Sequence, residues 1–221
     1  MAIKNKIFQI SLFKSLRLNL HYFPLKTAIK LPVLLSRKVN IRKLKGTVKI
    51  NCPIKTGLLR FGFDSLGIVD YNHNYAVWEN NGVLELNGTA NFGAATKLII
   101  LGGGYVIIGH RVSITGLSNI ISQRKISIGD DSLISWDVQI MDTDFHSITD
   151  INGKITNFPK EIFIGKHVWI GCRNLILKGS DIPDNSIIAA NSIINKRLNE
   201  SNCIYGGNPV KEIKADVNWE M

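Results

Sequence analysis

One histidine stands in a stretch of the chain that has no regular pattern. His146 lies within residues 141–163, MDTDFHSITDINGKITNFPKEIF, close to Asp142, Asp144 and Asp150. Imidazole titrates near neutral pH, so it can accept a proton from an attacking hydroxyl group, and a nearby carboxylate can fix the tautomer of the ring. His146 is therefore the candidate general base. Asp144 is the preferred partner, because in an extended segment its side chain can point the same way; Asp142 and a backbone carbonyl remain alternatives.

Regular repeats lie on both sides of this stretch. A period of six residues is typical of a hexapeptide β-helix, in which each short strand turns a corner into the next. Where the phase slips by two residues, the inward face of the strand stays inward, so the core continues. We expect the repeated isoleucines to form that core: Ile108, Ile114, Ile120 and Ile126, then Ile128, Ile134 and Ile140, and finally Ile164, Ile170, Ile176, Ile182, Ile188 and Ile194.

Composition bounds the class of protein. Hydrophobic residues make up 45% of the 221, enough for a sizeable core, and no run of 18 apolar residues predicts a membrane-spanning helix. The N-terminus lacks the order of a signal peptide, and three scattered cysteines do not form a disulfide framework or a CxxC metal site. These features together predict a cytoplasmic protein.

The net charge of +10 belongs to one end of the chain. Residues 1–63 hold 14 Lys and Arg and no acid, whereas residues 64–221 hold the other 13 against all 17 acids. This distribution argues against a nucleic-acid binder. The basic segment has some helical spacing, and two interpretations stay open: a cap on the end of the β-helix, or a basic arm that associates weakly with an anionic membrane surface.

The domain organisation predicted from these patterns has three parts. Residues 1–47 form a basic, partly helical N-terminal segment. Residues 48–205 form the β-helix, with the inserted loop 141–163. Residues 206–221 form a tail or cap with a short C-terminal helix, since the end of a stacked repeat has to be covered. The fold class is therefore all-β.

Several motifs together resemble a known family. The isoleucine ladder, D-T-D-F-H at 142–146, V-W-I-G at 168–171 and I-Y-G-G-N-P-V-K at 204–211 resemble the left-handed β-helix acyltransferases. Within these, the chain is most similar to the maltose, galactoside and xenobiotic O-acetyltransferases and to polysaccharide O-acetyltransferases, over about residues 105–214. The resemblance implies left-handed coils of three strands and a homotrimer with active sites between neighbouring prisms. It also implies direct acetyl transfer from acetyl-CoA to a sugar or glycan hydroxyl, with His146 as general base.

The resemblance also implies where coenzyme A binds. Its pantetheine arm can hydrogen-bond along exposed backbone at prism corners that carry small residues. The family's contacts fall on Cys172, where Ser or Gly is usual, on Asn195, where Thr is usual, and on Ala190 and Lys196. The cofactor phosphates need cations, and Lys196, Arg197, Lys211 and Lys214 are the candidates. Trp169, from the V-W-I-G motif, is expected to wall the cleft near the thioester.

Other functions remain possible from the residues alone. The acceptor could be an amino sugar or serine, or the β-helix could be a non-catalytic scaffold. Some zinc hydratases share this shape and carry an HxxxxH pair of ligands, but positions 141 and 151 are Met and Ile, so His146 lacks that partner and no metal is expected.

Overall fold

The isoleucines of both ladders form the core of a three-sided prism. The computed structural model describes residues 9–63, 67, 69–71 and 73–220. Every isoleucine of the two ladders is at most 1% exposed. Side chains alternate between the two faces of a strand, so one isoleucine per short strand is enough to fill the inside of each coil.

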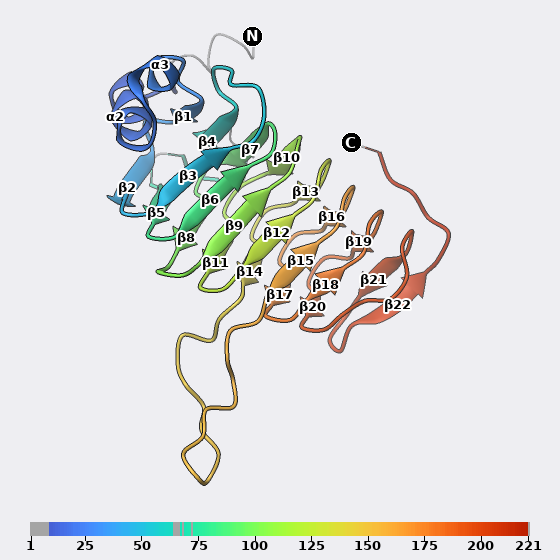
Figure 1. Cartoon of the computed structure of the whole chain (residues 1–221). Coiled ribbons are helices and arrows are strands. Elements are labelled where there is room, and N and C mark those ends of the chain that lie inside the picture. The colour runs from blue at the N-terminus through green and yellow to red at the C-terminus, as the bar shows by residue number, and fades with distance from the viewer. Residues whose placement is uncertain (1–8, 64–66, 68, 72, 221) are drawn as a thin grey trace.

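Three sheets form the sides of the prism, and their strands are parallel apart from the final pair (Figure 1). Sheet A contains β1 (Val33–Leu35), β4 (Leu59–Phe63), β7 (Ala90–Gly93), β10 (Val112–Ile114), β13 (Leu133–Ile134), β16 (Trp169–Ile170), β19 (Ile187–Ile188), β21 (Ile204–Gly206) and β22 (Lys211–Lys214). Sheet B contains β2 (Val39–Lys43), β5 (Ala76–Asn80), β8 (Lys97–Ile100), β11 (Asn119–Ser122), β14 (Gln139–Met141), β17 (Leu175–Leu177) and β20 (Ile193–Ile194). Sheet C contains β3 (Thr47–Ile50), β6 (Val83–Leu86), β9 (Tyr105–Ile108), β12 (Ile126–Ile128), β15 (Ile162–Ile164) and β18 (Asp181–Ile182).

The chain passes from sheet A to B to C in each coil, which defines three edges: the AB, BC and CA edges. Each edge is a stack of corners from successive coils. Several corners hold a residue with positive φ, such as Asp137 (59°) and Asn191 (59°) on the AB edge. Asn and Asp tolerate this left-handed conformation better than most residues, so the corners can be tight without glycine.

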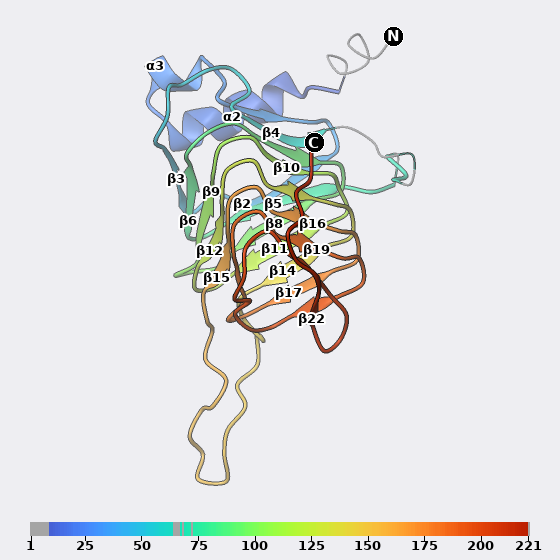
Figure 2. The same cartoon turned by 90° about the vertical axis from the view of Figure 1, so that its right-hand side faces the viewer.

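A long loop replaces one corner of the BC edge. It leaves the prism after β14 and returns at β15, and it projects away from the body in both views (Figures 1 and 2). Beyond the base, Thr149 and Ile155 form an antiparallel bridge that closes the tip. This loop is the unpatterned stretch that contains His146.

Two helices close the N-terminal end of the prism: α2 (Leu12–Tyr22) and α3 (Leu25–Ala28). Ser11 caps α2 by accepting a hydrogen bond from the Lys14 N–H at 3.4 Å. Leu18 of α2 enters the core, fully buried. The predicted helical N-terminal segment is present. Within the described residues, no helix is long and apolar enough to cross a membrane.

The predicted C-terminal helix is wrong. Residues 211–214 form β22, which pairs antiparallel with β21 at the end of sheet A. The last strand of an open sheet presents unpaired N–H and C=O groups, and the turn at 207–210 brings the chain back to satisfy them. At the other end, parallel pairing already begins with β1 at Val33, ahead of the boundary expected near residue 48.

Candidate active site

His146 lies at a pocket where the long loop leaves the prism. The pocket has a volume of about 210 Å³ and takes one wall from the preceding coil, through Gln123. The His146 side chain is exposed. The loop supplies the other walls: Thr143, Asp144, Phe145, His146, Ser147, Ile155, Asn157, Phe158 and Pro159.

Asp142 anchors the loop to the prism. Its carboxylate is fully buried and accepts hydrogen bonds from the Ser122 hydroxyl at 2.8 Å, the Gln123 N–H at 2.7 Å and the Arg124 N–H at 2.9 Å. A buried carboxylate needs hydrogen-bond donors, and these three groups supply them to both oxygens of Asp142. Asp142 therefore attaches the start of the loop to the prism and is not directed at the imidazole of His146.

Asp144 is part of a polar network beside His146. Its Oδ2 atom forms an ion pair with Lys178 and accepts a hydrogen bond from Asn157 Nδ2 at 2.7 Å. The hydrogen bond from the Lys178 ammonium, followed by that from Asn157, lowers the pKa of the Asp144 carboxyl below its usual range. The Asp144 carboxylate therefore stays ionised to a lower pH than an ordinary Asp carboxylate.

The backbone of His146 is held from both sides. Its N–H donates to the Asp144 carbonyl at 2.7 Å, and its carbonyl accepts from Asn157 Nδ2 at 2.8 Å. Lys178 also donates to the Asn157 carbonyl at 3.0 Å, which ties the loop to the next coil. No hydrogen bond joins the imidazole to another described residue, so both ring nitrogens can serve a bound substrate.

Sequence reasoning missed Asn157 and Lys178. Lys178 follows β17, one coil beyond the loop on the same BC edge, so the period of the coils places it below the insertion. That register was readable from the isoleucine ladder. Asn157 lies 11 residues beyond His146 in the loop, and no local pattern marked it.

Four of the residues expected to bind coenzyme A fall on two different edges of one prism. Cys172 and Ala190 lie on the AB edge in successive coils, which are joined there by a hydrogen bond from the Asn191 N–H to the Cys172 carbonyl at 3.0 Å. Asn195 and Lys196 follow β20 on the BC edge, which also carries the His146 loop. Sheet B separates the two groups within one chain.

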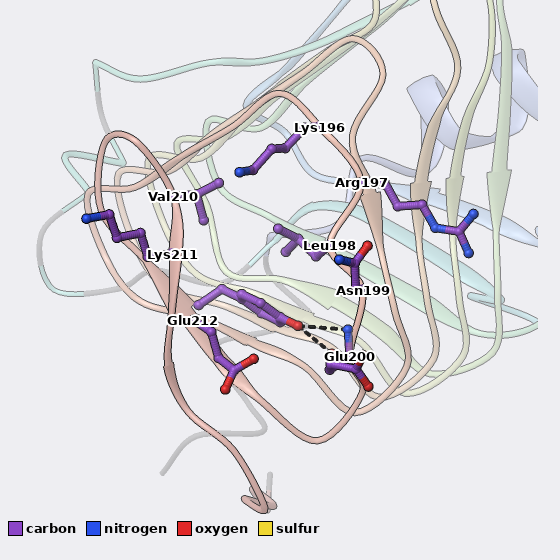
Figure 3. A pocket seen from close by; sticks show the side chains of 9 residues that line it. Lys196, Arg197, Leu198, Asn199, Glu200, Val210, Lys211 and Glu212 are labelled. Atoms are coloured by element: carbon purple, nitrogen blue, oxygen red, sulfur yellow. Dashed lines mark hydrogen bonds between the residues drawn. The ribbon is translucent and has the colours of Figure 1, made fainter.

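Two of the predicted phosphate-binding lysines share a pocket at the last coil (Figure 3). Lys196, Arg197 and Lys211 lie around a volume of about 380 Å³, together with Glu200 and Glu212. Tyr205 also lines this pocket, and its hydroxyl donates to the Glu200 carbonyl at 2.7 Å. Lys214 does not line this pocket; it is exposed on β22.

Trp169 lies on the outer face of sheet A, next to the AB edge. It is 38% exposed, and its Nε1 donates to the Ser135 hydroxyl at 3.2 Å. The C-terminal tail returns to this face, where Trp219 stacks on His167 with ring centroids 4.4 Å apart. Trp219 Nε1 also donates to the His167 carbonyl at 2.8 Å. Sequence reasoning missed Trp219, although a tryptophan in a polar tail is a signal of docking.

Nothing in the described part of the chain gathers three or more His, Cys, Asp or Glu side chains that could hold a metal ion. The polar groups around His146 are instead joined to one another as an amide, a carboxylate and an ammonium.

Several known proteins are similar to this chain in sequence. No protein-family model matches the chain. An uncharacterized 24.8 kDa protein in the cps region of Klebsiella pneumoniae is 30% identical over 190 residues, which cover 85% of this chain and 81% of that protein. The polysialic acid O-acetyltransferase of Escherichia coli O1:K1 / APEC is 36% identical over 119 residues, 53% of this chain but only 38% of that enzyme. The galactoside O-acetyltransferase of Escherichia coli K12 is 33% identical over 51% of this chain and 55% of its own length.

A solved structure shows the same fold. The crystal structure of the polySia-specific acetyltransferase NeuO superposes with a TM-score of 0.65 at 23% identity and covers 86% of this chain and 79% of that one. The all-β class predicted from the isoleucine period and the family resemblance carried by the combined motifs are both confirmed. The chain is therefore a hexapeptide-repeat protein with the left-handed β-helix fold, and the named enzymes to which parts of its sequence are similar are O-acetyltransferases.

Proposed function

We propose that this enzyme moves an acetyl group directly from acetyl-CoA to a hydroxyl group of a sugar or glycan, with His146 as general base. The observation that carries the proposal is the placement of His146. Its backbone is held by two hydrogen bonds, while its imidazole has none from the described residues and lines a pocket. A base needs a fixed position and a free nitrogen, and this arrangement supplies both.

The reaction balances with this one base. An imidazole nitrogen of His146 takes the proton of the acceptor hydroxyl as the oxygen attacks the thioester carbonyl carbon. Backbone N–H groups stabilise the charge that develops on the thioester oxygen. The carbon–sulfur bond then breaks, and the imidazolium returns its proton to the leaving thiolate. The products are the acetyl ester and coenzyme A.

Asp144 acts as a positioning residue in this proposal. Its carbonyl accepts the His146 N–H, and its carboxylate is held by Lys178 and Asn157. The base therefore stays at one place above the prism. In this role the Asp144 carboxylate is not bonded to the imidazole ring. Substitution of Asp144 should therefore lower turnover by displacing His146, while His146 still acts as the general base.

Two copies of the chain complete one site. The AB edge with Cys172 and Ala190 and the BC edge with the His146 loop lie on opposite sides of sheet B. A cofactor along the AB edge of one prism can meet the loop of a neighbouring prism, and three such contacts close a ring. We propose a homotrimer in which the phosphates of coenzyme A contact Lys196, Lys211 and Lys214, and Asn195 and Trp169 lie along the cleft.

A carbohydrate acceptor is the class that the named relatives favour. They are O-acetyltransferases of polysialic acid and of galactosides. Amide, carboxylate and hydroxyl side chains near the pocket suit the hydroxyl groups of a sugar, which are both donors and acceptors.

The first experiment measures free thiol released from acetyl-CoA with mono- and polysaccharide acceptors, amino sugars and serine. His146→Ala and His146→Gln should each lower kcat by at least about a hundredfold, because general-base catalysis contributes roughly 10²–10⁴-fold. His73→Ala is the matched control, an exposed histidine paired with Asp70 and remote from the pocket. Undiminished turnover in His146→Ala would sink the mechanism, and failure to bind coenzyme A in calorimetry would favour a scaffold.

The second experiment tests the shared site. His146→Ala removes the base and Ala190→Trp blocks the AB edge, so each variant alone should be inactive. Co-expressed in one oligomer, they should regain activity, because some interfaces pair an intact loop with an intact AB edge. A monomeric mass, or no recovery in mixed oligomers, would place the whole site within one chain.

A further inference from the structure

Helix α2 buries two polar side chains against the prism, beside Leu18, and leaves four large apolar side chains exposed to solvent. Ser15 and Asn19 are fully buried. Leu12, Phe13, Leu16 and Leu20 are 66%, 78%, 42% and 46% exposed. Residues four apart lie on one helical face, so these leucines form a stripe with Phe13 beside it. A packed surface helix normally shows the opposite arrangement.

The polar inner face has a structural reason. β1 is the edge strand of sheet A, and Asn19 satisfies Val33 by accepting from its N–H at 3.1 Å and donating to its carbonyl at 2.7 Å. Ser15 accepts from the Leu35 N–H at 2.9 Å. These bonds cover the open edge of the sheet. They do not explain the apolar outer face.

The apolar surface continues into α3. Leu25 is 67% exposed and Ile29, at the end of this helix, is 63% exposed. The two helices lie together at the N-terminal end of the prism, far from the His146 loop (Figures 1 and 2). Six large apolar side chains within 18 residues are far more than the scattered exposed residues of an ordinary surface.

The charged residues around this apolar surface indicate what kind of partner it binds. Arg17, Lys26 and Lys30 are exposed among the apolar residues. Residues 1–63 contain 14 Lys and Arg and no acid. A second copy of the same face would bring like charges together, which disfavours a symmetric dimer. An anionic lipid surface offers both the negative charge and the apolar layer that the two helices match.

We propose that α2 and α3 dock this enzyme on the surface of an anionic membrane, with Leu12, Phe13, Leu16, Leu20, Leu25 and Ile29 inserted between headgroups. The docked end of the prism lies opposite the end that carries the last coil (Figure 1). The enzyme then works at the membrane without a spanning segment. The acetyl transfer proposed for His146 does not depend on this contact.

The test uses the full chain and sedimentation with vesicles of phosphatidylcholine alone or mixed with phosphatidylglycerol. The protein should sediment with the mixed vesicles, and added salt should release it. Phe13→Ser with Leu16→Ser should lower the partition coefficient at least about tenfold, because each buried large apolar side chain is worth about that factor. Lys26→Gln with Lys30→Gln should also weaken binding, through charge alone.

Ile151→Ser is the matched control, since Ile151 is fully exposed at the tip of the long loop; it should bind as the parent does. All the substituted residues are exposed, so the thermal unfolding of the variants should match that of the parent. If the variant with Phe13→Ser and Leu16→Ser fails to fold, the variant with Lys26→Gln and Lys30→Gln still tests the proposal. Absence of binding to the mixed vesicles, or unchanged binding by both pairs, overturns the proposal. A smaller oligomer in the Phe13→Ser, Leu16→Ser variant would assign the face to a second copy and overturn it as well.

Discussion

Asn157 Nδ2 lies 2.8 Å from the backbone oxygen of His146, and the same nitrogen lies 2.7 Å from Asp144 Oδ2. One amide group therefore joins the segment of the loop that leaves the prism to the segment that returns to it. In the proposed mechanism, this bridge places the base.

Asn157→Ala should lower kcat about tenfold to a hundredfold, because a base displaced by an ångström loses much of its effect. The KM for acetyl-CoA should change little, since Asn157 lies outside the cofactor residues. Steady-state kinetics with both substrates would measure this. Asn152→Ala, in the exposed tip of the same loop, is the control and should keep full turnover; an equal loss there would mean that any loop substitution disturbs the site.

Lys178→Met should raise the pKa of the Asp144 carboxyl, because the main cause of its depression is removed. Since the folded-state pKa lies below the unfolded value, the contribution of Asp144 to stability is present above the ordinary Asp pKa and is lost as pH falls through the lowered one. NMR titration of the carboxyl carbon would show the shift. The variant should also lose loop order at a higher pH than the parent on acidification; an unchanged titration would contradict the ion pair.

Asp142→Ala should destabilise the fold, by roughly 1–3 kcal/mol, because it leaves the buried Ser122 hydroxyl and the Gln123 and Arg124 N–H groups without their acceptor. Denaturant unfolding would measure the loss. Asp150→Ala is the comparison, since Asp150 bonds only within the exposed tip, to the N–H groups of Asn152 and Lys154. Equal effects of the two substitutions would refute the anchoring role of Asp142.

Lys196→Gln with Lys211→Gln should raise the KM for acetyl-CoA roughly threefold to tenfold, with kcat nearly constant, because exposed cations contribute modestly to binding a phosphate. Lys97→Gln, on β8 of sheet B, is the control and should leave KM unchanged. An acetyl-CoA analogue without the 3′-phosphate shows which phosphate these lysines bind. If the double substitution raises KM less for the analogue than for acetyl-CoA, the lysines bind the 3′-phosphate. If the double variant keeps the parental KM, the last-coil pocket does not hold the cofactor.

The sequence by itself determined which side chains form the core of the β-helix. A period of six residues dictates which side chains point inward, because alternation along a strand is local, and every isoleucine of the ladders is buried as expected. The break in that period also located the loop with His146. Both features depend on short-range geometry, which the order of residues carries directly.

The partners of the loop were decided only by the tertiary structure. Asp142 and Ser122 are 20 residues apart, and Lys178 and Asp144 are 34 apart; both contacts exist because coils stack along the BC edge. The same holds at the ends of the prism. β22 forms a strand because β21 leaves an open edge of sheet A. At the other end, α2 buries Ser15 and Asn19 because β1 also leaves an open edge. Unpaired backbone groups at a sheet edge arise only when the sheet forms, so local patterns cannot show them.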